Sequence, residues 1–267
     1  MTSRGPTDPA AEAFWRAFLT TGDPSEIAKR RLFNRLPRGP RCRMCAAPFS
    51  GLGGTAMRVI GRGPSDSNPT MCMFCFTFLQ RQHGGAEIEA TFLFADVRGS
   101  TALAERMSVA EYRTLIDRFY TTATEVVFRH DGFVDKFVGD ELVAMYFPLL
   151  TGDAHPAQAV ATALDLLRAT GHEEARGPWV PLGAGVHTGN AWIGSVGEGG
   201  RSQVTALGDA VNTAARIGSA AAPGEILVST ESAPRAGLDV GLGRRSLELK
   251  GKQGTTEVVV LRVDAPA

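Results

Sequence analysis

Two apolar runs of the sequence, Phe133–Val138 and Leu142–Phe147, flank the dipeptide Gly139-Asp140. A glycine followed by a small polar residue between two strand-like runs is typical of a two-residue hairpin turn. The pattern therefore predicts that Asp140 lies at the tip of a hairpin, where paired strands hold its carboxylate in place.

Lys136 lies four residues before this aspartate, within the first apolar run. Strand alternation places its side chain on the same face as those of Val134 and Val138. Because lysine is rarely buried without a partner, Lys136 is predicted to belong either to a buried structural pair or to a functional site.

A second carboxylate, Asp96, ends another strand-like run, Thr91–Ala95, and precedes a turn of small residues. A carboxylate in this position can bind Mg²⁺, while backbone N–H groups at the start of the next helix face phosphates. The turn residues expected to contact a substrate in this way are Val97, Gly99, Ser100 and Thr101. The alternative is that Asp96 only caps the helix.

Asn212 and Arg216 lie four residues apart on a predicted helix, Ala210–Ile217, and therefore share one helix face. The arginine could bind a phosphate, with the asparagine beside it as a neutral donor. The alternative is a polar pair on the surface.

The four cysteines form two C-x2-C pairs, Cys42 with Cys45 and Cys72 with Cys75, separated by 26 residues. Each pair can supply two thiolates to one tetrahedral ion. We recognise no secretory signal, which argues against disulfides, and no histidine follows either pair, which argues against covalent haem. We expect one structural Zn²⁺, with an iron–sulfur cluster as the main alternative and a redox pair as another.

Alternating helices and strands are expected to position these residues. Ser108 and Glu111 form a capping box that opens a long helix, and a second helix is predicted near Asp153 to Ala169. Leu182–His187 and Ala191–Val196 are interpreted as two strands, with His187 as a packed core residue. Two short helices that follow Asp8-Pro9 and Asp23-Pro24 are predicted at the N-terminus, and a linker is predicted around His83-Gly84-Gly85.

The chain has 267 residues and a formal net charge of zero, so no global field favours nucleic acid or a membrane. Nine basic residues and no acidic one lie between Ile27 and Ser65, a pattern most often found on a solvated face. No run is long enough to span a bilayer, so we expect a cytoplasmic protein.

Over about Glu89 to Val263, the chain resembles the catalytic domain of class III nucleotide cyclases. The resemblance rests on four segments in order, FADVRGST (Phe94–Thr101), DKFVGDELVA (Asp135–Ala144), GVHTGNAWIGSVG (Gly185–Gly197) and TALGDAVNTAAR (Thr205–Arg216). It implies an α/β (α+β) sandwich with a ferredoxin-like, largely antiparallel sheet flanked by helices.

The resemblance also implies roles for single residues. Asp96 and Asp140 correspond to ligands of two Mg²⁺ or Mn²⁺ ions per active site, and Lys136 to the residue that reads adenine. The partner position of that lysine, the ribose-orienting position and the transition-state position fall on Thr205, Asn212 and Arg216 respectively. A lysine that contacts the terminal phosphates falls on Lys250, with Lys252 as the other possible register.

We therefore expect an adenylate cyclase for intracellular signalling that converts ATP into 3′,5′-cyclic AMP and pyrophosphate at sites shared by a homodimer. Its expected organisation is a helical segment (1–38), a four-cysteine module (39–84) and a catalytic domain (85–267). The alternatives are a guanylate cyclase, a nucleotide-binding regulatory module and a zinc nucleic-acid-binding protein. Neither membrane nor nucleic-acid binding is expected of the adenylate cyclase.

Overall fold

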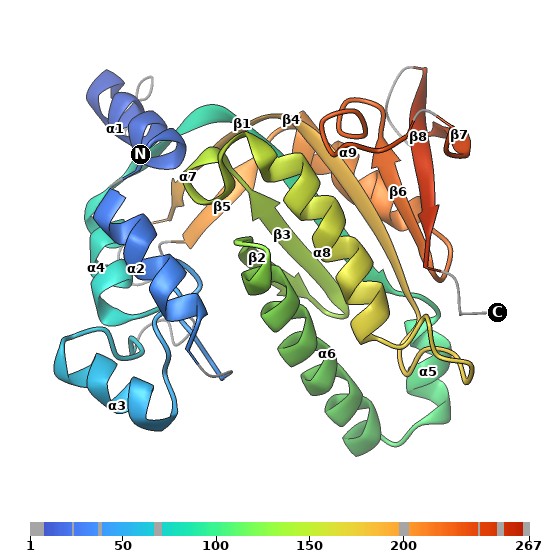
Figure 1. Ribbon diagram of the computed structural model, residues 1–267, viewed down its shortest axis with the longest axis horizontal. Coiled ribbons are helices and arrows are strands. Elements are labelled where there is room, and N and C mark those ends of the chain that lie inside the picture. Colours follow the sequence, from blue (N-terminus) through green and yellow to red (C-terminus); the bar gives the residue numbers. More distant parts are fainter. Residues whose placement is uncertain are drawn as a thin grey trace, which may run out of the picture. The chain divides into compact units, whose positions relative to one another are not determined.

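The computed structural model describes residues 8–22, 24–36, 39–66, 71–197, 203–239, 241–249 and 254–263 (Figure 1). The helices in this part of the chain are α1 (Pro9–Thr20), α2 (Pro24–Asn34), α3 (Gly51–Val59), α4 (Met73–Arg81), α5 (Ser100–Arg106), α6 (Val109–Arg129), α7 (Pro148–Thr151), a 3₁₀ turn (Gly152–Ala154), α8 (His155–Ala169) and α9 (Asp209–Ala220). The strands are β1 (Gly84–Val97), β2 (Phe133–Val138), β3 (Glu141–Tyr146), β4 (Leu182–Val196), β5 (Gln203–Leu207), β6 (Glu225–Ser229), β7 (Arg244–Glu248) and β8 (Thr255–Arg262).

The strands form one sheet in the order β2-β3-β1-β4-β6-β8-β7, and β5 pairs with β4. The pairing of β4 with β6 is parallel, whereas β2 with β3, β3 with β1, β4 with β5, β6 with β8 and β7 with β8 are antiparallel. This mixed, mainly antiparallel sheet with flanking helices confirms the predicted fold class.

The chain divides into two compact units. The first unit contains the chain up to Ile88 together with Pro148–Leu150 and Ala191–Leu207. The second unit contains Glu89–Phe147, Thr151–Asn190 and the chain from Gly208 onwards.

In the second unit, α6 and α8 pack on one face of the sheet (Figure 1). The capping box of Ser108 and Glu111 begins α6, as predicted, and Phe119 and Ala123 are among the α6 residues buried in the core. Alternate residues of the strands, such as Ile226 and Val228, complete this core. The hydrophobic face of each helix is therefore matched to one face of the sheet.

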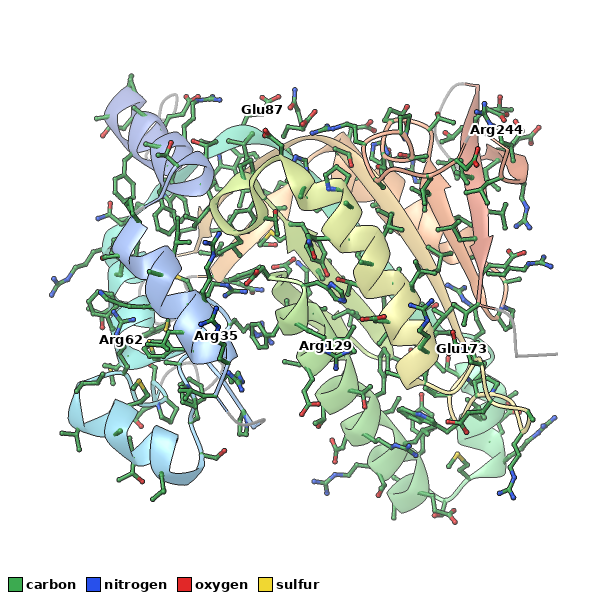
Figure 2. The ribbon with its side chains drawn as sticks, in the orientation of Figure 1. Arg35, Arg62, Glu87, Arg129, Glu173 and Arg244 are labelled. Atoms are coloured by element: carbon green, nitrogen blue, oxygen red, sulfur yellow. The ribbon has the colours of Figure 1, made fainter. Side chains whose placement is uncertain are left out.

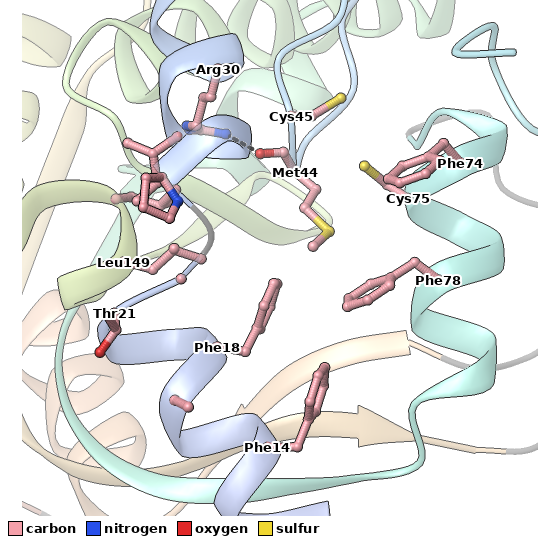
Figure 3. Close-up of a pocket in the computed structure, with 15 residues that line it drawn as sticks. Phe14, Phe18, Thr21, Arg30, Met44, Cys45, Phe74, Cys75, Phe78 and Leu149 are labelled. Carbon is pink, nitrogen blue, oxygen red and sulfur yellow. Dashed lines mark hydrogen bonds between the residues drawn. The ribbon is translucent and has the colours of Figure 1, made fainter.

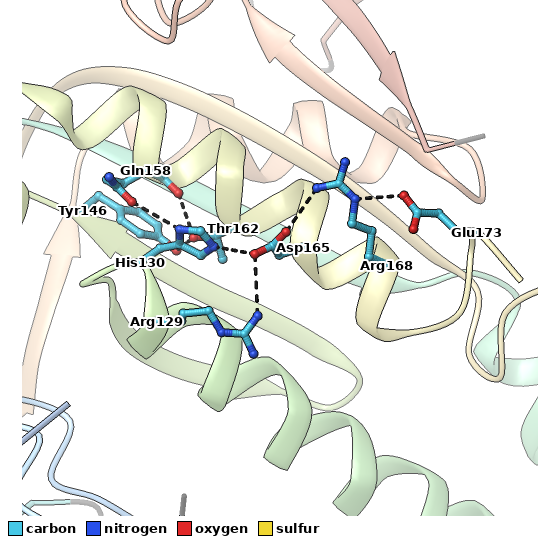
Figure 4. A network of polar contacts seen from close by, with 8 residues as sticks. All are labelled: Arg129, His130, Tyr146, Gln158, Thr162, Asp165, Arg168 and Glu173. Atoms are coloured by element: carbon cyan, nitrogen blue, oxygen red, sulfur yellow. Dashed lines mark hydrogen bonds and ion pairs between the residues drawn. The ribbon is translucent and has the colours of Figure 1, made fainter. Parts of the chain in front are cut away.

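A polar network joins the C-terminal end of α6 to α8 (Figure 4). His130 Nε2 lies 2.9 Å from Asp165 Oδ2, and Arg129 and Arg168 approach the same carboxylate at 3.6 and 3.2 Å. Burial raises the pKa of Asp165, but its hydrogen bonds to His130 and Arg168 outweigh that effect and lower the pKa overall. Asp165 therefore remains ionised and connects the two helices.

The opposite face of the sheet is covered by α9, whose Ile217 packs with Leu227 and Val258. Close approach of backbone positions this helix, since a Cβ on Gly185 of β4 would overlap the backbone of Gly218 in α9. Only glycine allows such an approach, so this glycine pair determines how near α9 lies to the sheet.

In the first unit, several arginines of the basic stretch hold loops together. Arg30 and Arg41 each donate to two main-chain carbonyl oxygens, and the guanidinium of Arg62 (labelled in Figure 2) lies 4.4 Å from the ring centroid of Phe74. Arg30 and Arg62 are buried. These contacts favour a structural role for part of the basic stretch over an open nucleic-acid-binding face.

Two sequence predictions about strands were wrong. Residues 182–196 form the single strand β4 instead of two strands around Thr188-Gly189, because β4 pairs with β6 near one end and with β5 near the other. Gly84 and Gly85, predicted to lie in a linker, begin β1. A Cβ on Gly85 would overlap Trp192, so this glycine serves close packing between strands. His187 is buried and hydrogen-bonded to Ser229 at 2.8 Å, as expected of a core residue.

Candidate active site

Asp96 and Asp140 are both in the second unit, at the edge formed by the end of β1 and the β2–β3 turn. Asp96 lies opposite Glu141 in the register of β1 and β3, and Asp140 precedes Glu141 in the turn. Gly139 has a φ of +61°, which a two-residue hairpin turn requires and glycine adopts without strain. The predicted hairpin with Asp140 at its tip is therefore confirmed.

The electrostatics of this edge favour a bound cation. Burial raises the pKa of Asp96; the charge of Arg98 opposes this rise and that of Asp140 adds to it. Burial and the charge of Asp96 raise the pKa of Glu141 to about 7. Among the described residues, no group hydrogen-bonds Asp140 Oδ2, although this oxygen is buried. Clustered carboxylates with an unsatisfied buried oxygen fit the oxygen ligands that Mg²⁺ or Mn²⁺ prefers.

In the turn after Asp96, the side chain of Val97 is buried, whereas the backbone at Gly99 has open space beside it. Val97 is buried in the core, so only its backbone could contact a substrate. Gly99 has a φ of +71°, and a Cβ there would meet no atom within 4 Å. Ser100 and Thr101 form the first turn of α5. The space beside Gly99 is therefore open, and contact of this turn with a phosphate stays a prediction.

A β-bulge changes the position of Lys136. Val134 pairs with Ala144, but Lys136 pairs with Val143, so the register shifts by one residue at Asp135. The prediction that Lys136 shares a face with Val134 was therefore wrong. The bulge places Lys136 on the face of the sheet that carries Asp96, and its ammonium lies 3.2 Å from Asp135 Oδ2. Bulges commonly redirect side chains at functional sites in this way.

Asn212 and Arg216 occupy α9, with Asn212 exposed and Arg216 half-buried. The helix is connected to the carboxylate edge through Arg98. This arginine donates to the carbonyl oxygens of Gly218 and Ser219 at 2.7 and 3.2 Å, and its Nη2 lies 3.5 Å from Asp96 Oδ2. Arg98 thus links the first carboxylate to the C-terminal turn of α9.

Thr205 and the predicted phosphate-binding lysine are not among the described residues of the second unit. Thr205 belongs to β5 in the first unit, where it is buried and pairs with Gly194 of β4. Lys250 and its alternative Lys252 lie outside the described residues.

Cys42, Cys45, Cys72 and Cys75 converge in the first unit as free, buried cysteines, and their sulfurs lie within 4.8 Å of one another. The Sγ atoms of Cys45 and Cys72 are 3.7 Å apart, close to the edge of a tetrahedron whose centre lies about 2.3 Å from each corner. The backbone N–H of Cys72 donates to Cys42 Sγ at 3.2 Å. The four sulfurs could hold a metal ion.

Sequence reasoning did not assign roles to Arg98 and Glu141. Glu141 directly follows Asp140, which was a usable signal for a third carboxylate. The role of Arg98 depends on acceptors 120 and 121 residues away in the sequence, and no local pattern reveals these.

Residues 86–261, about two thirds of the chain, match the family model described as the adenylate and guanylate cyclase catalytic domain. Adenylate cyclase 1 of Rhizobium meliloti (strain 1021) is 34% identical over 139 residues, which cover 48% of this chain and 20% of that protein. The adenylate cyclase of Anabaena cylindrica is 31% identical over 172 residues, which cover 61% of this chain and 34% of that protein. The chain therefore spans about a fifth to a third of the length of these curated relatives.

Solved structures show the same fold. The guanylyl cyclase Cya2 matches with a TM-score of 0.61 at 24% identity, covering 66% of this chain and 93% of its own. The adenylyl cyclase CyaB from P. aeruginosa matches with a TM-score of 0.59 at 24% identity, covering 67% of this chain and 96% of its own. Among the described residues, no helix combines the length and apolar character needed to cross a bilayer.

Proposed function

Because the chain belongs to the family of adenylate and guanylate cyclase catalytic domains, we propose that it converts ATP into 3′,5′-cyclic AMP and pyrophosphate for intracellular signalling. The observation that carries this proposal is the carboxylate edge of the second unit, where Asp96 and Asp140 converge and a buried oxygen of Asp140 has no hydrogen-bond partner among the described residues. The names of two adenylate cyclase relatives support the choice of reaction.

Asp96 and Asp140 would hold two Mg²⁺ or Mn²⁺ ions, which when bound lower the pKa of the attacking ribose hydroxyl and neutralise the triphosphate. In the reaction, the ribose 3′-oxygen forms a bond to the α-phosphorus and pyrophosphate leaves. The backbone at Val97, Gly99, Ser100 and Thr101, together with Lys250, would position the phosphates.

Asn212 and Arg216 would act on the reacting end of the substrate. Asn212 is exposed on α9 and can hydrogen-bond the ribose, while the planar guanidinium of Arg216 can stabilise negative charge that develops in the transition state. The catalytic contribution of these residues is positioning and charge stabilisation.

Lys136 supports ATP as the substrate. Adenine N1 accepts a hydrogen bond, which an ammonium group can donate, whereas guanine N1 carries a proton and requires an acceptor. The bulge directs Lys136 to the same face of the sheet as Asp96, and we propose that this face meets the second copy of the chain. Thr205 would assist as a hydroxyl partner for the base.

Each active site would form between two copies of the chain, with Asp96 and Asp140 from one copy and Lys136, Asn212 and Arg216 from the other. The resemblance to class III cyclases supports this division. One structural Zn²⁺ on the four cysteines would stabilise the first unit, because the observed sulfur spacing suits a tetrahedral ion.

The test of base choice is incubation of the purified chain with ATP or GTP and Mg²⁺ or Mn²⁺, followed by identification of the products. We expect cyclic AMP as the main product, and we expect Lys136→Glu to lose ATP turnover because a carboxylate cannot donate to adenine N1. Arg129→Glu, which makes the same kind of charge reversal on α6, should retain the preference for ATP. Equal use of GTP by the unmodified chain would contradict the assignment.

A further inference from the structure

The first unit contains a cavity of about 690 Å³ that the proposed cyclase reaction does not use (Figure 3). Its walls come from α1, α2, α4, α7 and the loop that carries Met44 and Cys45. Small-molecule sites in proteins are typically concavities of about 300–1,000 Å³ with mainly apolar and aromatic walls, so the cavity has the size of a ligand site.

Phenylalanine rings form one side of this cavity. Phe14 and Phe18 are stacked with their ring centroids 6.1 Å apart, and Phe78 lies 5.5 Å from Phe18 and 6.1 Å from Phe14. Despite these contacts, Phe14 is 36% exposed, and Phe74, which also lines the cavity, is 49% exposed. A further ring inserted here could make the offset or edge contacts that aromatic pairs prefer.

The remaining walls are also largely apolar. Ile27, Met44, Leu149 and Leu150 contribute aliphatic or thioether surface. The guanidinium of Arg30 donates to the carbonyl oxygens of Arg43 and Met44, so it ties α2 to the cysteine loop at the cavity wall. An ionised ligand group would lose hydration on entering such a site, which disfavours charged occupants.

We propose that this cavity binds an uncharged, predominantly apolar small molecule that contains an aromatic ring. The ring stacks against Phe14, Phe18 and Phe78, and the rest of the molecule packs on Met44 and the leucines of α7. This binding does not depend on the cyclase assignment, because none of the residues that line the cavity belongs to the proposed active site.

The test uses the full chain and two matched dyes. N-phenyl-1-naphthylamine is uncharged and fluoresces in apolar surroundings, and 8-anilino-1-naphthalenesulfonate shares its aromatic skeleton but adds one negative charge. We expect saturable binding of about one uncharged dye per chain, with at least tenfold weaker binding of the sulfonate. Absence of saturable binding by the uncharged dye, or tighter binding of the sulfonate, would overturn the proposal.

A pair of variants on α1 locates the binding. Ala17 is exposed and lines the cavity, so Ala17→Trp fills the space without altering the packed core, whereas Ala13 is exposed on the same helix but does not line the cavity. We expect Ala17→Trp to weaken binding of the uncharged dye at least tenfold and Ala13→Trp to leave it unchanged. Equal binding by both variants, with unaltered circular dichroism, would show that the dye binds elsewhere and contradict the proposal.

Discussion

In the second unit, close packing of the backbone positions the side chains proposed for catalysis. In the first unit, four cysteine sulfurs from loops and short helices lie together instead. The contact between Gly185 and Gly218 sets the distance of α9 from the sheet, and the bulge at Asp135 directs Lys136. The four-cysteine module (39–84) instead contains the short helices α3 and α4 and two isolated β-bridges, Arg41 with Pro48 and Pro64 with Cys72. Modules of this size, which can build only a small core, usually need a metal or disulfides for stability.

This comparison predicts that the two units can be damaged separately, and the largest effect is expected in the second. Asp140→Asn keeps the size of the side chain but removes its charge, so the proposed metal ions lose a ligand. We expect turnover of ATP to fall by about a thousandfold, with the zinc content unchanged. The measurement is cyclic AMP production alongside elemental analysis.

The control for this substitution is Asp117→Asn on α6, whose exposed carboxylate lies 3.6 Å from the guanidinium of Arg113, one turn earlier on the same helix. It should keep turnover within about twofold, because exposed helix ion pairs contribute little. Full activity of Asp140→Asn would show that this carboxylate is not a metal ligand.

The corresponding experiment on the first unit removes its proposed metal ion. Elemental analysis of chain purified without chelator should find about one zinc per chain, and Cys72→Ser should abolish it because a tetrahedral site loses one of its four ligands. Limited proteolysis should then cut between residues 39 and 84 while the second unit stays protected. Iron with sulfide would identify a cluster instead, and the absence of both metals would contradict the proposed metal site.

A smaller effect is expected from acid at Glu225 on the interior strand β6. Glu225, whose side chain is 3% exposed, accepts hydrogen bonds from Arg245 and Arg262 at 2.7–2.9 Å. The hydrogen bonds from Arg245, the larger effect, and from Arg262 lower the pKa of Glu225, whereas burial raises it. The net result is a pKa of about 2. Because the folded-state pKa is depressed, the stabilisation is complete above the ordinary pKa of about 4.5 and is lost as the pH falls from there towards about 2.

This carboxylate should contribute about 3 kcal/mol to the free energy of unfolding at neutral pH. Urea unfolding of the native chain and of Glu225→Gln should therefore differ by that amount at pH 7 and converge only as the pH falls to about 2 or below. Acid also protonates thiolates, but both chains carry the same cysteines, so their difference isolates Glu225. Glu248→Gln on β7, where the carboxylate is exposed, should differ little from the native chain at any pH. A constant difference between the native chain and Glu225→Gln would contradict the assigned pKa.

The parts of this comparison that depend on neighbouring residues were predictable from the sequence. The hairpin at Gly139-Asp140 follows from turn chemistry, and the capping box of Ser108 and Glu111 follows from local hydrogen bonding. The spacing within each cysteine pair likewise predicted two neighbouring sulfurs, because each pair lies within one loop or helix turn. That the two pairs meet followed from the four ligands of a tetrahedral ion.

The features that depend on distant residues could not be predicted from local patterns. The bulge at Asp135 depends on how β2 pairs with β3, and a one-residue shift reverses the face of every later side chain. The continuity of β4 through Thr188-Gly189 depends on pairing with β5 and β6, which overrides the local preference of glycine for turns. The contacts of Arg98 with α9 arise only in the folded chain.

The central claim is that each active site takes its carboxylates from one copy of the chain and Arg216 from the other. Homodimers of Asp96→Ala and of Arg216→Ala should each be nearly inactive, because every site contains one lesion. In a mixed dimer, both lesions fall in one site and the other site is intact.

The direct measurement is cyclic AMP production after the two inactive variants are mixed and allowed to exchange subunits, with exchange verified by co-purification of differently tagged chains. Random exchange makes about half of the dimers mixed, each with one intact site, so activity should recover to roughly a quarter of the native level. Mixing Asp96→Ala with Asp140→Ala should restore nothing, because each site then takes its carboxylates from a damaged copy. If the first mixture stays inactive despite verified exchange, the shared-site account is wrong for this protein.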